Sequence, residues 1–128
     1  MNLNTESMKP IYVQIAEWLE GEILNENIKE EERIYSQYQL ADMFTINPAT
    51  AAKGLNILAD EKIVYKKRGL GMFVSLNAKQ FILTKRREQS LRIMIKELVL
   101  EANRLEVSES ELNTMIEQVR SENEEEER

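Results

Sequence analysis

The stretch NPATAAKGL at residues 47–55 decides how this chain folds. Asn47 is a favoured residue for capping the start of a helix, and Pro48 suits the first helical position because it needs no amide hydrogen there. Ala51, Leu55 and Leu58 then recur at helical spacing. The stretch therefore predicts a helix that begins after Asn47 and buries one apolar face.

A shorter helix is expected just before this one. Ser36 and Gln39 have the spacing of a capping box, and Tyr35 and Leu40 occupy the flanking apolar positions. The predicted helix continues through Phe44 and leaves only a turn of three or four residues before the next helix. Two short helices joined in this way form a helix-turn-helix.

The hydrophobic pattern changes from helical to extended after the second of these helices. Ile63–Lys66 favours a strand, Arg68–Gly71 a tight turn, and Met72–Val74 a second strand. A β-hairpin directly behind a helix-turn-helix is the wing of a winged-helix domain.

The first helix of the chain is predicted to begin near Pro10. Ile11, Ile15, Leu19 and Ile23 recur every four residues and form its apolar face. The polar residues 25–33 that follow are predicted to be a loop.

Helical spacing returns from about Lys79 and breaks at Glu106 and Val107. Ser108 and Glu111 form a second capping box for a last helix, whose acidic end at residues 121–128 is expected to fray. Two helices alone bury little apolar surface, so this hairpin is expected to pair with a second copy in a four-helix interface. The predicted dimerisation residues are Leu91, Met94, Ile95, Leu98, Ala102, Leu105, Leu112, Met115, Ile116 and Val119.

The predicted fold class is mainly α with a small β-hairpin. Residues 1–76 are predicted to form a winged helix-turn-helix domain that binds DNA, and residues 77–128 a two-helix dimerisation hairpin with an acidic tail.

Composition excludes several function classes. The chain has no cysteine and no histidine, so it lacks thiolate chemistry and the commonest metal ligand and general base. It contains no phosphate-binding loop, dinucleotide fingerprint or nucleophile elbow. No run of about 18 apolar residues occurs. We expect no enzyme activity, no metal, no cofactor, no membrane partner and a cytoplasmic location.

The net charge of −6 does not by itself favour a nucleic-acid partner. However, a local basic surface suffices for phosphate binding, and bases predominate between Asn47 and Val74, whereas acids gather elsewhere. Lys66, Lys67 and Arg68 can donate to phosphates, and an arginine can enter a narrow minor groove. Alternatively, the hairpin is an ordinary turn with a solvated basic flank.

Two further basic or polar segments keep two interpretations each. Asn47 can cap its helix or contact DNA, and one side chain can do either. Lys85, Arg86 and Arg87 either touch phosphates or form the solvated start of a long helix, which we favour.

The chain resembles the GntR superfamily of bacterial regulators. The resemblance lies in Pro10–Ile15, in Ser36 with Leu40 and Ala41, in Ile46–Thr50 and in Arg68–Val74. The Asn-Pro-x-Thr sequence at residues 47–50 and the short helical C-terminal region are similar to the YtrA-type subfamily.

This resemblance implies a repressor that binds a palindromic double-stranded operator as a homodimer, often of its own operon and beside ABC-transporter genes. Tyr38 stands where the family usually has a DNA-contacting arginine. The region after the wing is too short for the large metabolite-binding domain of other members, and leaves room only for a small effector, whose identity is unknown. Together, the residues and the resemblance predict DNA contacts by Tyr38, Asn47, Pro48, Ala49, Thr50, Ala52, Lys53, Lys67, Arg68 and Gly69.

A rival hypothesis comes from a different class of protein. The net acidity and the alanines of the third helix also suit an adaptor module that binds another protein through a winged helix without DNA. A salt-dependent gel shift against DNA from the upstream region of its own operon would separate the two.

Overall fold

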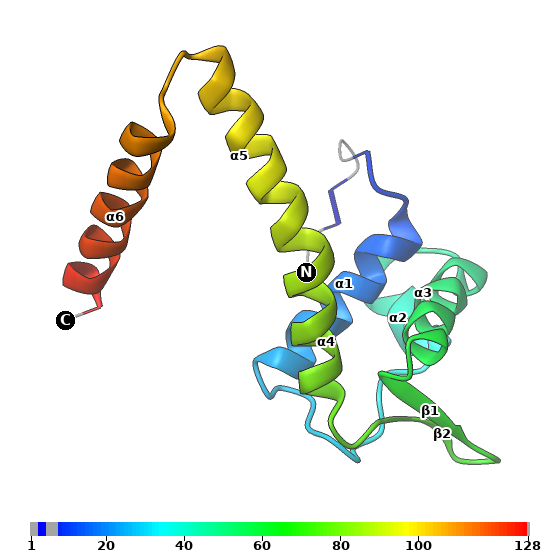
Figure 1. Ribbon diagram of the computed structural model, residues 1–128. Helices are drawn as coiled ribbons and strands as arrows, with labels where there is room; N and C mark the ends of the chain where they lie inside the picture. The colour runs from blue at the N-terminus through cyan, green and yellow to red at the C-terminus, as the bar shows by residue number, and fades with distance from the viewer. Residues whose placement is uncertain (1–2, 5–7, 128) are drawn as a thin grey trace. The chain divides into compact units, whose positions relative to one another are not determined.

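The computed structural model describes residues 3–4 and 8–127 of the chain. Contacts divide the chain into two compact units, Met1–Lys85 and Arg86–Arg128. The elements, shown in Figure 1, are α1 (Ile11–Leu24), α2 (Gln37–Phe44), α3 (Pro48–Asp60), β1 (Val64–Lys67), β2 (Gly71–Val74), α4 (Ala78–Arg86), the π-helical turn η1 (Arg87–Leu91), α5 (Arg92–Arg104) and α6 (Glu109–Glu126). The fold is mainly helical with a two-stranded hairpin, as predicted.

The core of the first unit lies between α1, α2 and α3. Ile15, Leu19 and Ile23 of the predicted α1 face are buried, and they pack in one cluster with Leu40 of α2 and with residues of α3. Each such side chain contributes about 1.5–3 kcal/mol by leaving water. The contribution from α3 comes from Ala51, Leu55 and Leu58, the three residues predicted from their spacing.

The helix α1 begins at Ile11, one residue after Pro10. Pro10 is the N-cap, with an extended backbone (φ −57°, ψ 151°), and its carbonyl accepts the amide hydrogens of Val13 and Gln14. The predicted start near Pro10 is therefore right, although the proline lies just outside the helix rather than in its first turn.

The hairpin is antiparallel, and Val64 pairs with Val74 at the end that enters the core. Both valines are buried, and they anchor the wing to the helices. A third segment runs beside β2, because the amide of Ile34 donates to the carbonyl of Met72 and the amide of Val74 donates to that of Glu32. The predicted strands differ from the observed ones by a single residue at their ends.

The helix α4 belongs in part to the first unit. Its residues Ala78 and Ile82 are fully buried in the core cluster. The first compact unit therefore reaches Lys85, whereas the sequence placed the end of the DNA-binding domain at residue 76. The helical segment after the wing starts as a structural part of the winged-helix core.

The second unit contains η1, α5 and α6. Glu106 takes a left-handed conformation (φ 58°) in the short connection, and the side chain of Ser108 accepts the amide hydrogen of Glu111 at 3.1 Å, as the capping box predicted. The helix α6 continues to Glu126, through the acidic residues whose fraying was expected from the sequence. Glutamate is a strong helix former, so the acidic run extends the helix. No helix in the part of the chain that the structure describes has both the length and the apolar character needed to cross a bilayer.

Candidate nucleic-acid interface

Local side-chain hydrogen bonds fix the starts of α2 and α3. The Ser36 hydroxyl accepts the amide hydrogen of Gln39 at 3.1 Å, and the Gln39 side chain accepts that of Ser36 at 2.8 Å. The helix α2 ends at Phe44, and its C-cap Thr45 has a left-handed backbone (φ 54°). The side-chain oxygen of Asn47 then accepts the amide hydrogen of Ala49 at 2.8 Å, so α3 starts with a capped first turn.

Asn47 is thus a helix cap in this structure. Its oxygen accepts the amide hydrogen of Ala49, and the residue as a whole is exposed. Of the two roles that the sequence left open for Asn47, helix capping is the one observed in the structure. Contact with DNA remains a prediction.

One face of α3 is exposed to solvent. Ala49, Lys53 and Asn56 lie on it at successive helical turns, opposite the buried residues. The ammonium of Lys53 lies 5.6 Å from the ring centroid of Tyr12 in α1, a cation–π geometry that holds its stem near the helix. The face therefore offers a cation and an amide to a partner.

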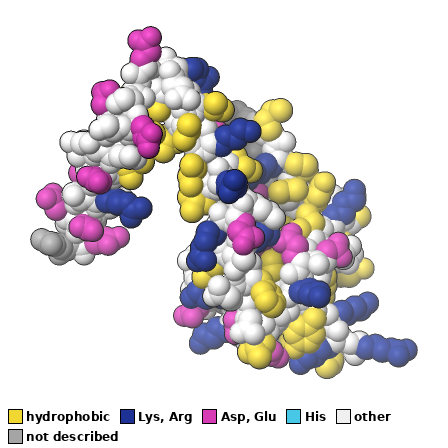
Figure 2. Space-filling model, viewed as in Figure 1, with side chains coloured by type: hydrophobic (Ala, Val, Ile, Leu, Met, Phe, Trp, Pro, Cys, Tyr) yellow, Lys and Arg dark blue, Asp and Glu magenta, His cyan; other side chains and the backbone are white. Residues whose placement is uncertain are grey.

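The two lysines of the wing lie on opposite faces of β1. Lys67 lies on the face of Tyr65, and its ammonium is 4.2 Å from the ring centroid of Phe73. Lys66 is exposed on the other face, which it shares with the buried Val64. Arg68 and Gly69 form the exposed tip, where Gly69 adopts a positive φ of 79°. Figure 2 shows basic side chains gathered over this end of the hairpin.

The structure leaves every predicted DNA-binding residue at least partly accessible, and four of them are only half exposed. Pro48, Thr50, Ala52 and Lys67 are half-buried, and the others are exposed, with 69% of Tyr38 in solvent. The predicted set of DNA contacts omits Asn56 and Arg33, and it omits Lys66 although the sequence marks this lysine as a possible phosphate donor. Helical spacing from Ala49 would have found Asn56. The position of Arg33 beside the wing depends on a long loop and has no local signal.

Lys85 has a structural role that neither earlier interpretation anticipated. Its ammonium donates to the buried carboxylate of Glu20 in α1, and it lies 2.6 Å from a carboxylate oxygen of Glu61 at the end of α3. Burial alone lowers the pKa of Lys85, but the hydrogen bonds and charges of the two glutamates outweigh it and raise that pKa above 10.5. Lys85 therefore ties α4 to α1 and α3, whereas Arg87 is exposed as expected.

The second unit exposes a large amount of apolar surface. Figure 2 shows hydrophobic side chains along α5, and all the predicted dimerisation residues except Ala102 and Leu112 are exposed. Ile93, Val99 and Leu100, which the prediction omitted, are exposed as well. Ala102 is buried within the single chain, and Leu112 is half-buried.

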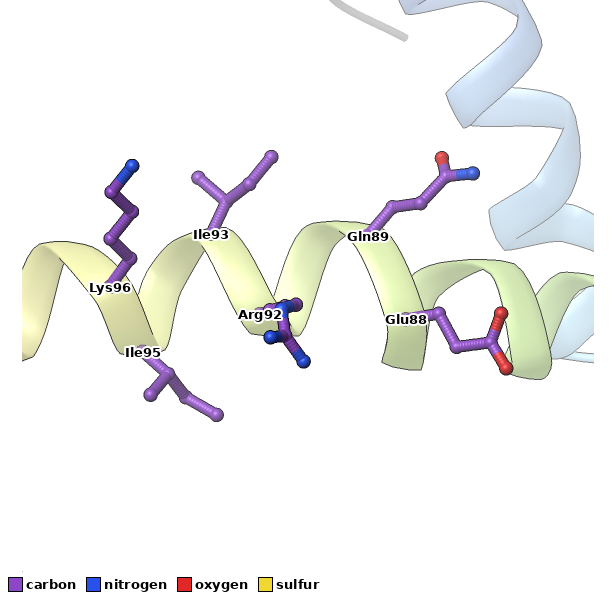
Figure 3. Close-up of a pocket in the computed structure, with 6 residues that line it drawn as sticks. All are labelled: Glu88, Gln89, Arg92, Ile93, Ile95 and Lys96. Carbon is purple, nitrogen blue, oxygen red and sulfur yellow. The ribbon is translucent and has the colours of Figure 1, made fainter.

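A hollow of about 790 Å³ lies beside η1 and α5 but does not form a ligand site. Its lining residues all come from one stretch of helix, residues 88–96. Figure 3 shows that their side chains project from this helix in different directions, with Ile93 and Ile95 on different sides, and do not converge on a common point. The hollow is part of the exposed surface of the helix.

Sequence comparison gives two bacterial relatives. The HTH-type transcriptional repressor YtrA of Bacillus subtilis is 27% identical over 119 residues, which cover 93% of this chain and 91% of YtrA. The HTH-type transcriptional repressor NagR of the same organism is 36% identical over 75 residues. That match covers 59% of this chain but only 31% of NagR, so the chain spans about a third of that relative. No family model matches the chain.

Comparison with solved structures agrees with these relatives. A GntR-family transcriptional regulator from Bacteroides thetaiotaomicron superposes with a TM-score of 0.76 at 30% identity, covering 89% of this chain and 99% of that one. The DNA-binding domain of AraR in complex with the operator ORX1 superposes with a TM-score of 0.53 at 25% identity, over 59% of this chain and 93% of that one.

YtrA, NagR and the Bacteroides protein are regulators of transcription rather than enzymes, in agreement with the function class expected from the sequence. The Bacteroides regulator shares the architecture over nearly its whole length at 30% identity. The chain thus belongs to the GntR family of DNA-binding transcriptional regulators.

Proposed function

We propose that this protein represses transcription by binding a palindromic operator as a homodimer. Each copy presents the exposed face of α3 to the major groove and the wing to the adjacent backbone or minor groove. The observation that carries the proposal is the charge of this surface. In a chain of net charge −6, no acidic residue occurs from Lys62 to Arg87 or from Met43 to Ala59.

The contacts to DNA divide into two kinds. At the start of α3, Asn47, Pro48, Ala49, Thr50 and Ala52 offer amide, hydroxyl and methyl groups, which suit base edges and thymine methyls. Lys53, Lys67, Arg68, Gly69 and Tyr38 suit the phosphate backbone. Because α3 carries few long polar side chains, direct base readout is limited, and the wing supplies much of the affinity. The operator complex of the AraR domain supports DNA as the partner.

Dimerisation is proposed to occur through α5 and α6. The helix α5 carries exposed apolar residues on more than one side, among them Ile93, Met94 and Leu98. A helix that is apolar around much of its circumference needs partners around it, and a second copy of this hairpin provides them. A two-fold dimer of this kind matches the symmetry of a palindromic operator. We propose the DNA-binding function for residues 1–76 and the dimerisation function for residues 77–128, in which α5 and α6 form the interface and α4 packs on the winged-helix core through Ala78 and Ile82.

The target of repression is proposed to be the protein's own operon in the cytoplasm, with ABC-transporter genes among those controlled. The similarity to YtrA supports this choice of subfamily. The test is a footprinting experiment with DNA from the upstream region of the protein's own gene. A protected palindrome with salt-dependent affinity is expected. No protection at low salt, together with capture of a protein partner by the α3 and wing surface, would instead support the adaptor hypothesis.

A further inference from the structure

A cleft of about 270 Å³ lies where the first turn of α2 meets α3 and the wing. Tyr38 lines it from α2, Asn56 from α3, and Lys66 and Gly71 from the two strands, while Arg33 lines it from the loop before α2. The cleft therefore joins the exposed face of α3 to the base of the wing.

Backbone pairing holds Arg33 in this place. Arg33 forms a β-bridge with Phe73, and the neighbouring Ile34 amide donates to the carbonyl of Met72 at 2.9 Å. The guanidinium lies directly over Gly71, since a Cβ built on Gly71 would fall 3.0 Å from Nε and 3.3 Å from Nη2 of Arg33. Gly71 also has a φ of 104°, which side-chain-bearing residues rarely adopt. The glycine thus makes room for the arginine beside β2.

Lys66 reaches the same cleft by strand alternation. It pairs with Met72 and lies on the hairpin face that continues into the core at Val64 and Val74. Lys67, on the other face, has its ammonium over the ring of Phe73 instead. The cleft therefore contains Lys66 and excludes its neighbour.

The charged residues that line the cleft are all basic. Its lining residues include two cations and no acid, although acids outnumber bases in the chain by 23 to 17. Within the described residues, neither Arg33 nor Lys66 forms an ion pair. Arginine stays charged at any pH that a folded protein survives, and its planar fork matches the oxygens of a phosphate.

We propose that this cleft binds one backbone phosphate of the DNA duplex, with Arg33 and Lys66 as its ligands. The inference rests on the proposed function, and it assigns a phosphate contact to two residues of this same surface. Because the cleft opens beside the exposed face of α3, a duplex lying on that face presents its sugar-phosphate chain there. A phosphate contact fixes the position of the duplex and carries no sequence preference of its own.

The test compares Arg33→Gln and Lys66→Gln with the wild type by fluorescence anisotropy, using operator and scrambled duplexes at several salt concentrations. Each variant is expected to lose affinity for both duplexes by a similar factor, roughly 5- to 20-fold. The slope of log affinity against log salt should decrease in magnitude by about one. Arg33→Lys should keep the slope. Lys79→Gln is the control, because it removes the same charge from α4 without lining the cleft.

Wild-type affinity and salt slope in both glutamine variants would overturn the inference and leave the proposed function standing. Loss of operator binding alone, with an unchanged slope, would also overturn it, because that result describes base readout. If the two variants keep full DNA affinity but lose binding of inorganic phosphate, measured by calorimetry without DNA, the cleft serves a free phosphorylated ligand and the DNA assignment is wrong. A wild type that binds neither duplex contradicts the proposed function itself.

Discussion

Gly54 of α3 lies so close to α1 that a Cβ built on it would fall 2.9 Å from the carbonyl oxygen of Tyr12 and 3.0 Å from Cγ2 of Ile15. The two helices therefore touch through backbone at this point, and a larger residue would force them apart. This contact sets how far α3 stands from the core. The exposed face of α3, with Ala49 and Lys53, is oriented by the same contact.

Gly54→Ala is expected to destabilise the fold by about 1–3 kcal/mol, because the obstructing atom is backbone and cannot rotate away. Gly21→Ala is the matched control. Gly21 lies within α1 and has no atom within 4 Å of a built Cβ, so alanine should be neutral or stabilise the helix by up to about 1 kcal/mol. Urea denaturation of both variants measures the difference. Equal stability of the two variants would show that α1 can shift at little cost.

The dimer proposal makes a second prediction. Leu98 is 44% exposed on α5 in the single chain. Leu98→Asp should place an unpaired charge in the interface and cost several kcal/mol of association energy, on the order of 3–5 kcal/mol. Sedimentation equilibrium at micromolar concentration should then give a folded monomer.

Asn103→Asp is the control for this variant, because it adds the same charge at an exposed position of α5 outside the predicted stripe. It should remain dimeric. A folded Leu98→Asp variant that also remains dimeric would place the interface elsewhere.

The local features of the interface were predictable from sequence because their partners are close in the chain. Ser36 and Gln39 are three residues apart, and Asn47 caps the amide of Ala49 two residues later. The wing turn follows from the conformational freedom of Gly69 in the same way. Helical and strand periods also indicated the buried residues of α1 and α3, since burial selects one face of each element.

Features that depend on distant partners were not predictable. Lys85 and Glu20 are 65 residues apart. The sequence contains one hint, because Glu20 falls on the same helical face as the buried residues Ala16 and Ile23, where a carboxylate needs a partner. The sequence does not indicate which basic residue is the partner of Glu20. Arg33 likewise depends on the pairing of a loop with β2, and the exposed faces of Lys66 and Lys67 depend on which side of the hairpin meets the helices.

Lys85→Met should destabilise the fold by about 3 kcal/mol at neutral pH, because it takes a cation from Glu20, a residue that is 1% exposed. Lys79→Met is the control. The ion pair of Lys79 with Glu26 is exposed and 3.7 Å long, so its loss should cost less than about 1 kcal/mol.

The wild type and Lys85→Met should also respond differently to alkaline pH. The pKa of Lys85 is raised above 10.5 in the fold, so its bound proton stabilises the folded chain. This contribution is complete below pH 10.5 and is lost as the pH rises through the folded pKa. The gap in unfolding free energy between wild type and Lys85→Met should therefore narrow above pH 10.5. A gap that stays constant to higher pH would contradict the role given to this proton.

The tip of the wing supplies the final prediction. Arg68 is exposed, and the positive φ of Gly69 lets the turn bring it to a DNA backbone without a side chain in between. Arg68→Ala should weaken operator binding by roughly 1–3 kcal/mol per half-site. If Arg68 contacts a phosphate, the salt slope should also fall. If it enters the minor groove, the preference for A·T-rich flanks should relax.

Lys67→Ala is the comparison for the wing tip. Its ammonium is placed over Phe73 and carries no base-specific geometry, so its removal should lower affinity evenly for operator and scrambled duplexes. Anisotropy titrations of both variants at several salt concentrations separate the two roles. Near-wild-type binding by Arg68→Ala under every condition would remove the wing tip from the interface. The affinity would then have to come from Tyr38, Thr50 and Lys53, whose alanine variants would be measured in the same titration.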